Sequence, residues 1–161
     1  MNATTKQSAS VDSFVVAEVN YTAIPSLEEL ERRFSYRVSS VFSDGKTRLE
    51  LHRLCIPHEP ERGYKRFLIH QSPIRIRWDE LIVSKFDQGF RPATFGEALE
   101  VVRQRPDLLK NYLVVPGTFV QDVSGESHVL MGRDFGKPFL DIGLRFRMAD
   151  PNTRVLFIQR K

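Results

Sequence analysis

The chain has 161 residues, which is enough for one ordinary domain and too few for two. Hydrophobic residues make up 41% of it and charged residues 27%, which excludes disorder of the whole chain, collagen-like repeats and a coiled coil. Lysine and arginine number 24 against 20 aspartates and glutamates, so the net charge is +4, which allows but does not demand an anionic partner. A core of this size needs no metal for stability, and we expect no cofactor.

The N-terminus gives no sign of an address or anchor. Residues 1–13 are rich in Ser, Thr and Asn, and we predict a mobile tail there, followed by a single domain over residues 14–161. No apolar run approaches the length of a transmembrane helix, so we expect no contact with a membrane. Cys55 is the only cysteine, which excludes an internal disulfide and fits a reducing compartment. The expected location is the cytoplasm.

The first half of the domain is predicted to be mostly strands. Alternating or continuous apolar residues place them over residues 14–19, 36–42, 47–56, 64–70 and 74–78. Ser26 and Glu29 form a capping-box pattern before a helix over residues 27–34. Asp44-Gly45 is a favoured two-residue turn, so the second and third strands are predicted to form a hairpin.

Two helices and then further strands are predicted for the second half. One helix starts at Trp78 and stops at Gly89, and the next starts from a second capping box, Thr94 and Glu97, and is interrupted at Pro106. The strands that follow are predicted over residues 112–115, 118–123, 128–131, 140–148 and 154–159. Short turns between neighbouring strands favour antiparallel pairing. We therefore predict an α+β fold with a mostly antiparallel, curved sheet and two or three helices on one face.

A segment at the start of the second half resembles a known group of sequences. The run Gly89-Phe90-Arg91-Pro92-Ala93-Thr94, followed by Glu97 and Pro106, is similar to a stretch of small uncharacterised bacterial proteins. Those proteins continue with a short helix and several strands to a basic C-terminus, and the resemblance covers the chain from Gly89 onward. It implies a bacterial protein with an α+β C-terminal half, and it implies no activity.

One cluster of residues has the chemistry of a metal site or a nucleophile. His52, Cys55 and His58 are close in sequence, and His70 could join them from the neighbouring strand. Imidazole and thiolate are good zinc ligands, and a thiol next to a histidine can act as a nucleophile. Residues three apart on a strand point to opposite faces, however, so a site would need a bulge or turn near Pro57. A half-buried cysteine with ordinary histidines is the simpler interpretation.

A second cluster lies in the turns of the C-terminal strands. Asp122, His128 and Asp134 could meet at one end of these strands, where loop residues held by a rigid sheet often carry function. Aspartate and glycine are also the usual turn formers, so the same residues are explained by turn geometry alone.

The distribution of charge suggests a third kind of site. Residues 45–77 and 142–161 are net basic, whereas the rest of the chain is net acidic. Arginines recur at alternate strand positions, which places them on one outward face at about the spacing of phosphates in an extended strand of nucleic acid. The candidate residues for binding a polyanion are Arg75, Arg77, Arg145, Arg147 and Arg154. Cross-strand pairing with acids would make the same arginines an ordinary solvated surface.

No catalytic pattern outweighs its simpler structural explanation. The sequence therefore favours a small non-catalytic binding or protein-interaction module with a protein partner. Binding of nucleic acid through the arginine-rich face is one alternative. An enzyme or metalloprotein centred on His52, Cys55 and His58 is the other. The sequence leaves the oligomeric state and the identity of the partner open.

Overall fold

A computed structural model describes most of the chain. The described residues are 11–20, 26–32, 36–38, 48–55, 62–122, 125–134, 136–142 and 148–160. Within these ranges, no helix has both the length and the apolar surface needed to cross a membrane.

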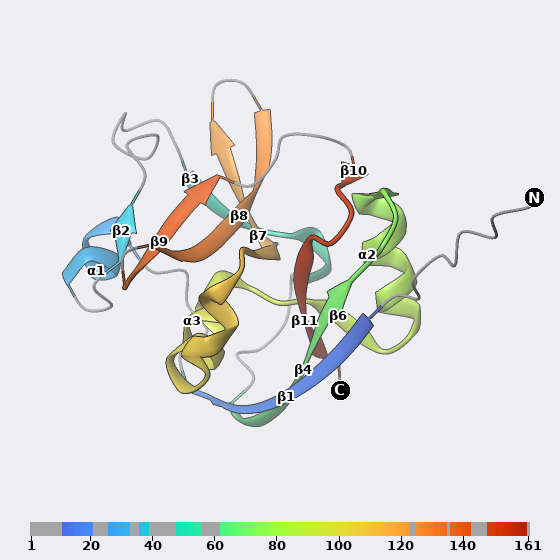
Figure 1. The fold of residues 1–161 in the computed structure, drawn as a ribbon, viewed down its shortest axis with the longest axis horizontal. Helices are drawn as coiled ribbons and strands as arrows, with labels where there is room; N and C mark the ends of the chain where they lie inside the picture. Colours follow the sequence, from blue (N-terminus) through green and yellow to red (C-terminus); the bar gives the residue numbers. More distant parts are fainter. Residues whose placement is uncertain are drawn as a thin grey trace, which may run out of the picture.

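Nine of the described strands form one sheet (Figure 1). They are β1 (Val11–Val19), β2 (Arg37–Val38), β3 (Arg48–Leu51), β4 (Gly63–Gln71), β6 (Phe90–Pro92), β7 (Leu113–Asp122), β8 (Gly125–Asp134), β9 (Lys137–Ile142) and β11 (Arg154–Gln159). The main order across the sheet is β1-β4-β11-β7-β8-β9-β2, with β3 paired to β7 and β6 paired to β11. Most neighbours are antiparallel, as predicted, whereas β11 with β7 and β2 with β9 are parallel. A separate short ladder joins β5 (Ile76–Arg77) to β10 (Met148–Ala149).

Three α-helices lie in the described part of the chain. They are α1 (Leu27–Arg32), α2 (Trp78–Asp87) and α3 (Phe95–Gln104), and two short 3-10 turns, η2 (Arg53–Cys55) and η3 (Pro106–Lys110), accompany them. The predicted capping box at the start of α3 is confirmed, because the Thr94 hydroxyl accepts the Glu97 N–H and the Glu97 carboxylate accepts the Thr94 N–H. Gly89 follows α2 with a φ of 93°, a left-handed conformation that favours glycine.

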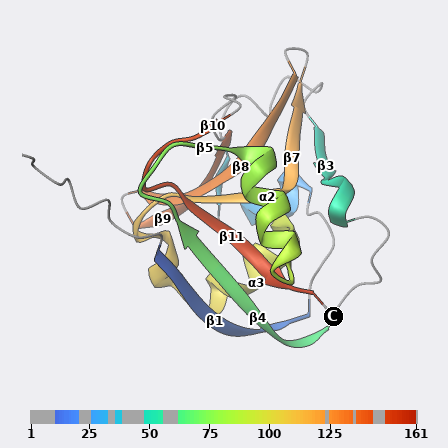
Figure 2. The same ribbon diagram turned by 90° about the vertical axis from the view of Figure 1, so that its right-hand side faces the viewer.

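The helices cover two faces of the sheet, not one as predicted. The second half of β4 and most of β11 are buried on both sides, and their side chains alternate between two separate cores. Phe67, Ile69, Leu156 and Ile158 pack with α3, whereas Leu68, Val155 and Phe157 pack with α2. Figure 2 shows α2 in front of these strands and α3 behind them. The physical reason is the runs of consecutive apolar residues in these strands, which are typical of strands covered on both faces.

The predicted hairpin over residues 36–42 and 47–56 does not form between its described parts. Strand β2 pairs in parallel with β9, and β3 pairs antiparallel with β7. The proposed turn, Asp44-Gly45, lies outside the described residues. Alternation identifies a strand but not its partner, which depends on contacts far away in the sequence.

Two other boundaries differ from the prediction. Strand β1 begins at Val11, so the described end of the predicted tail belongs to the sheet. The strands predicted over residues 128–131 and 140–148 extend toward each other, because β8 runs to Asp134 and β9 starts at Lys137, and the two form a hairpin. Gly132 makes this packing possible, since a Cβ there would lie 2.5 Å from the Phe139 ring.

A buried ion pair connects β6 to α3. The side chains of Arg91 and Glu97 are each only 3% exposed. Two hydrogen bonds join the guanidinium to the carboxylate, at 3.0 and 2.5 Å, and Arg91 also donates to the Pro92 carbonyl at 3.2 Å. One oxygen of the same carboxylate accepts the Thr94 N–H at 2.9 Å. The pair therefore fixes the start of α3 against the sheet.

Strand β7 and turn η2 contact the segment that connects β6 to α3. The Thr118 hydroxyl accepts the Phe95 N–H at 2.8 Å, and the Gly117 N–H donates to the Ala93 carbonyl at 2.9 Å. A Cβ on Gly117 would lie 2.3 Å from that carbonyl oxygen, so the close approach requires glycine. The Cys55 thiol donates to the Pro92 carbonyl at 3.3 Å. The Gly89–Thr94 segment thus has a structural role in this fold.

We predict that Arg91→Met lowers the free energy of unfolding by about 3 to 5 kcal/mol, because Glu97 would remain as a buried charge without its cation. Urea denaturation measures this change. The double variant Arg91→Met/Glu97→Gln should lose clearly less, since the amide is neutral and can still accept the Thr94 N–H. Arg105→Met removes an exposed arginine paired with Asp107 and is the matched control, with little expected loss. An equal loss in the single and double variants would contradict the prediction.

Candidate functional site

The structure does not bring the predicted histidine and cysteine ligands together. His52 follows β3, and its Nδ1 accepts the Leu54 N–H at 3.2 Å. Cys55 ends η2 and bonds the Pro92 carbonyl, whereas His70 lies in β4 and bonds Asp12. His58 lies outside the described residues. Among the residues that are described, no group of three His, Cys, Asp or Glu side chains could hold a metal ion.

The Cys55 thiol is buried and held in its protonated form. Burial raises the pKa of this thiol to about 12, and the nearby Arg91 opposes that shift only in part. Thiolates are the nucleophilic form, so a thiol with this pKa is inert at neutral pH. The environment of Cys55 therefore supports a structural role.

The second predicted cluster is spread along one strand. Asp122 pairs with Gly125 at one end of β8, and Asp134 pairs with Lys137 at its other end. A ten-residue strand is about 30 Å long, so the two backbones are far apart and the predicted convergence does not occur. His128 lies between them, with its ring centroid 4.5 Å from that of Trp78. Burial, followed by the charge of His52, lowers the pKa of His128 to about 4, so this ring is neutral at neutral pH.

Two of the predicted polyanion-binding arginines face carboxylates. Arg75 pairs with Asp150 at 3.3 Å, and Arg77 forms a two-pronged pair with Asp79 at 2.8 and 3.1 Å. Arg154 instead donates to the Leu108 carbonyl at 2.8 Å. The other two candidates, Arg145 and Arg147, lie outside the described residues. The described arginines thus do not form a row of unpaired cations.

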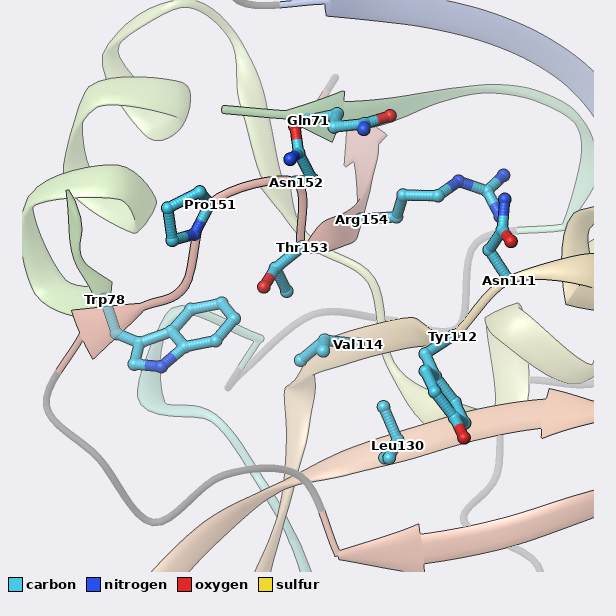
Figure 3. Close-up of a pocket in the computed structure, with 10 residues that line it drawn as sticks. All are labelled: Gln71, Trp78, Asn111, Tyr112, Val114, Leu130, Pro151, Asn152, Thr153 and Arg154. Atoms are coloured by element: carbon cyan, nitrogen blue, oxygen red, sulfur yellow. The ribbon is translucent and has the colours of Figure 1, made fainter. Parts of the chain in front are cut away.

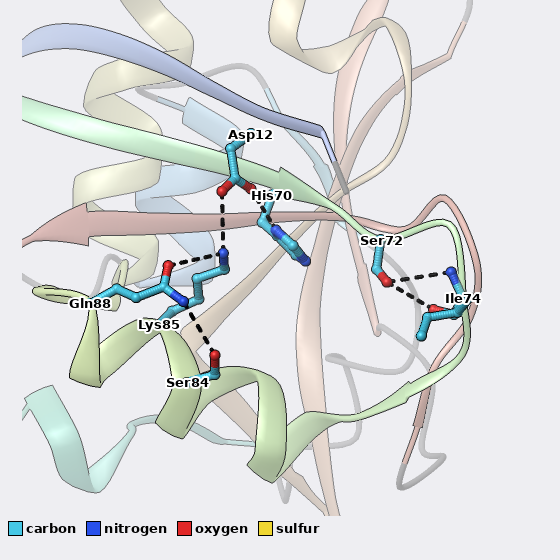
Figure 4. Close-up of polar contacts among 7 residues, drawn as sticks. All are labelled: Asp12, His70, Ser72, Ile74, Ser84, Lys85 and Gln88. Atoms are coloured by element: carbon cyan, nitrogen blue, oxygen red, sulfur yellow. Dashed lines mark hydrogen bonds and ion pairs between the residues drawn. The ribbon is translucent and has the colours of Figure 1, made fainter. Parts of the chain in front are cut away.

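A charged network that the sequence did not suggest ties β1 to β4 and α2 (Figure 4). One carboxylate oxygen of Asp12 lies 2.6 Å from His70 Nδ1, and the other accepts a hydrogen bond from Lys85 Nζ at 3.3 Å. Burial alone would raise the pKa of Asp12, but His70 and Lys85 outweigh it and the pKa is lowered. Gln88 also accepts a bond from the Lys85 ammonium. The network fixes the N-terminal half of β1 on the sheet.

Among the described residues, the free edge of β1 is covered only at Glu18. The Gln104 side chain accepts the Glu18 N–H at 2.9 Å and donates to the Glu18 carbonyl at 2.8 Å. These backbone groups therefore point away from β4. The direction of N–H and C=O alternates along a strand, so those of Phe14 and Val16 point the same way as those of Glu18. Within the part of the chain that the structure describes, they have no hydrogen-bond partner.

Exposed apolar side chains stand beside this open edge. Phe14 and Val16 share the outer face of β1, and the register places Tyr64 of β4 on the same face, diagonal to Val16. Helix α2 covers Leu68 of the same face but leaves Val16 65% and Tyr64 76% exposed. The Arg66 guanidinium lies 3.9 Å from the centre of the Phe14 ring and has no carboxylate partner among the described residues. We call Phe14, Val16, Tyr64 and Arg66 the β1 face.

Comparison of the chain with protein-family models, with curated proteins and with solved structures finds no match. The resemblance of the Gly89–Thr94 segment to bacterial sequences therefore stays a prediction.

The sequence predicts the strand that carries the β1 face, but not its position at the edge of the sheet. The apolar residues from Phe14 to Val19 predict a strand there. Its position at the edge of the sheet is a property of the topology, which no local pattern shows. Asp12 was missed because its Ser- and Thr-rich neighbours indicated a tail.

We predict that acid destabilises the protein through His128. Its pKa is about 4 in the folded chain against 6.5 for an ordinary histidine, so unfolding takes up a proton between these pH values. Stability is then constant above about pH 6.5, falls as the pH is lowered through this window, and has lost roughly 3 kcal/mol at pH 4. His128→Phe keeps a ring against Trp78 without the titration. Urea denaturation from neutral pH to pH 4 should show a smaller loss for this variant, and parallel curves would contradict the prediction.

We also predict that Asp12→Ala destabilises the fold, because the Lys85 ammonium, whose side chain is 7% exposed, would lose its carboxylate. The Asp12 side chain is partly exposed, so the expected loss is about 2 kcal/mol, less than for a fully buried pair. Thermal or urea denaturation measures it. Ser13→Ala changes an exposed neighbour in the same strand and should have little effect. Similar losses in the two variants would show that the network contributes nothing specific.

Proposed function

We propose that this protein is a non-catalytic interaction module that binds an extended segment of a partner protein along β1. The observation that carries the proposal is the open edge of β1 beside the exposed apolar β1 face. An unpaired strand edge is a template for one more strand, and proteins usually cover or charge such an edge. Here Gln104 covers the edge at Glu18, whereas Phe14 and Val16 keep their backbone groups free of partners in the described part of the chain.

The partner segment would add a strand to the sheet. Its main chain would bond to the N–H and C=O of Phe14 and Val16, which supplies affinity without dependence on sequence. Alternate side chains of the segment would lie over the β1 face and bury Phe14, Val16 and Tyr64. Gln104 would end the pairing at Glu18 and so limit the register.

Charge on the β1 face favours an acidic segment. Arg66 stacks on Phe14, a side chain of the edge strand β1, and no described carboxylate pairs with it. A carboxylate on the outward side of the added strand would meet this guanidinium. Charge-assisted hydrogen bonds of this kind add specificity as well as affinity. We therefore expect a segment that carries apolar and acidic residues at alternate positions.

The two alternative functions receive less support from the described residues. Arg75 and Arg77 already face Asp150 and Asp79, which weakens the case for a phosphate-binding row. Cys55 and His70 bond to different partners in different elements, which weakens the case for a metal or nucleophilic centre.

A designed peptide tests the proposal. Threonine occupies every second position of this peptide, and the positions between are filled by valine and glutamate by turns. A matched peptide carries lysine in place of each glutamate. We expect the acidic peptide to bind roughly tenfold more tightly than the basic one, as measured by fluorescence anisotropy. Hydrogen exchange should show new protection of the Phe14 and Val16 amides when the acidic peptide is bound.

Two variants of Val16 distinguish the contribution of main-chain hydrogen bonds at the edge from that of side-chain contacts. Val16→Pro removes one N–H that β4 does not use, so the sheet should survive and peptide binding should be lost. Val16→Thr keeps the N–H and should bind with nearly unchanged affinity. Binding that is the same in both variants, or that prefers lysine, would overturn the proposal. A dimer in solution that Val16→Pro dissociates would do so as well, since a second copy of the chain would then occupy the edge.

A further inference from the structure

A cavity of about 600 Å³ opens on the α2 side of the sheet, away from the β1 edge (Figure 3). The end of β4, the starts of α2, β7 and β11, and the middle of β8 surround it. Figure 3 labels the described residues that line it. This volume lies in the range of pockets that hold small organic molecules.

One side of the cavity is apolar and aromatic. Val114 and Leu130 form a cross-strand pair between β7 and β8 and make its floor. Figure 3 shows the six-membered ring of the Trp78 indole pointing over this floor. At the opposite end stands Tyr112, whose ring meets Phe139 edge-on at 5.9 Å and is held beside Gly132. Two aromatic rings and an aliphatic floor suit the flat apolar ring system of a ligand.

The rim supplies hydrogen-bonding groups at fixed positions. Asn152 has a φ of 65°, and its N–H donates to the Ser72 carbonyl at 2.7 Å, which fixes the turn that carries it. The next residue, Thr153, donates its N–H to the Asp150 carbonyl at 3.2 Å. Asn111 and Gln71 add side-chain amides, each of which can both donate and accept.

The cavity also has a definite charge. Arg154 is its only charged residue among the described lining residues, and no acid lines it there. The guanidinium is half-buried, and its one hydrogen bond among the described residues is to the Leu108 carbonyl, so most of its N–H donors remain for a ligand. Asp107 acts on it electrostatically but does not form an ion pair with it. It lies at the Asn111 end of the cavity, opposite Trp78 (Figure 3). No described carboxylate lies within ion-pair distance of it.

From this arrangement we infer that the cavity is a binding site for a planar aromatic molecule that carries one anionic group. The ring would lie on Val114 and Leu130 against Trp78, and the anion would meet Arg154 and Asn111. An aromatic carboxylic acid and a nucleoside monophosphate both have this chemistry. The site is separate from the β1 face and does not depend on it.

The single tryptophan makes this inference directly testable. Trp78 is the only tryptophan in the chain, so its indole N–H gives one identifiable NMR signal at the site. Naphthoate and adenosine monophosphate are titrated as the two probes, with naphthamide and adenosine as their uncharged counterparts. Cyclohexanecarboxylate serves as an anion without an aromatic ring. We expect saturable shifts of the Trp78 signal with at least one anionic probe, and roughly tenfold weaker binding of its neutral counterpart.

Three variants check the assigned roles. Arg154→Gln should weaken binding of the anionic probe roughly tenfold while leaving the neutral counterpart unchanged. Arg32→Gln removes the same charge from an exposed arginine of α1 that does not line the cavity and should have no effect. Tyr112→Leu changes an exposed ring and should weaken both members of the pair. Thermal denaturation confirms that each variant is folded.

The outcomes separate the two sources of ligand. Binding of naphthoate alone identifies an aromatic carboxylate, binding of adenosine monophosphate alone identifies a nucleotide, and binding of both shows that ring and charge suffice. The inference is overturned if neither anionic probe shifts the Trp78 signal saturably. It is also overturned if cyclohexanecarboxylate or the neutral counterparts bind as tightly as the anions, or if Arg32→Gln weakens binding as much as Arg154→Gln.

Discussion

The buried pair of Arg91 and Glu97 is the contact on which the rest of the structure depends. Two fully desolvated charges are costly unless each has a partner, so the strand that carries Arg91 and the helix that carries Glu97 must be placed together. Glu97 also caps its own helix, which makes the start of α3 part of the same arrangement. Since α3 packs on β1 and β7, and β6 pairs with β11, the pair fixes how the helix and the centre of the sheet meet.

The division of the core into two parts determines where partners can bind. Strands β4 and β11 have apolar side chains on both faces, so one helix covers each side. Helix α2 is too short to cover the whole of its face. It leaves the outer side of β1 exposed at one end and a cavity beside its first residue, Trp78, at the other. Both proposed binding regions thus follow from one short helix on a wide sheet.

Local signals in the sequence predicted single elements well. The capping box of Thr94 and Glu97, the helix that starts at Trp78 and the strand over residues 154–159 are all present. These depend on contacts within a few residues, which a sequence pattern can show. The pairing of β2 with β9 and of β3 with β7 depends on distant residues, and the pattern instead suggested a hairpin.

The candidate sites were less predictable than the elements. Histidines, cysteine and arginines were singled out by residue type, yet burial and neighbouring carboxylates decide their chemistry. Cys55 is a protonated thiol under Pro92, and Arg77 is paired with Asp79. Arg154 is the exception, since it was singled out from the sequence and lines the cavity. The open edge of β1 and the cavity arise from topology, so residue type alone did not reveal them.

A side-chain amide has the same donor and acceptor as a peptide group, and Gln104 uses both on Glu18. It therefore imitates one residue of a further strand and occupies the place where that strand would continue. Stacking of strands into fibrils requires uninterrupted segments of about six or seven residues. The substitute peptide group leaves β1 with a shorter free stretch, so the same edge can accept a brief partner segment while resisting open-ended self-association.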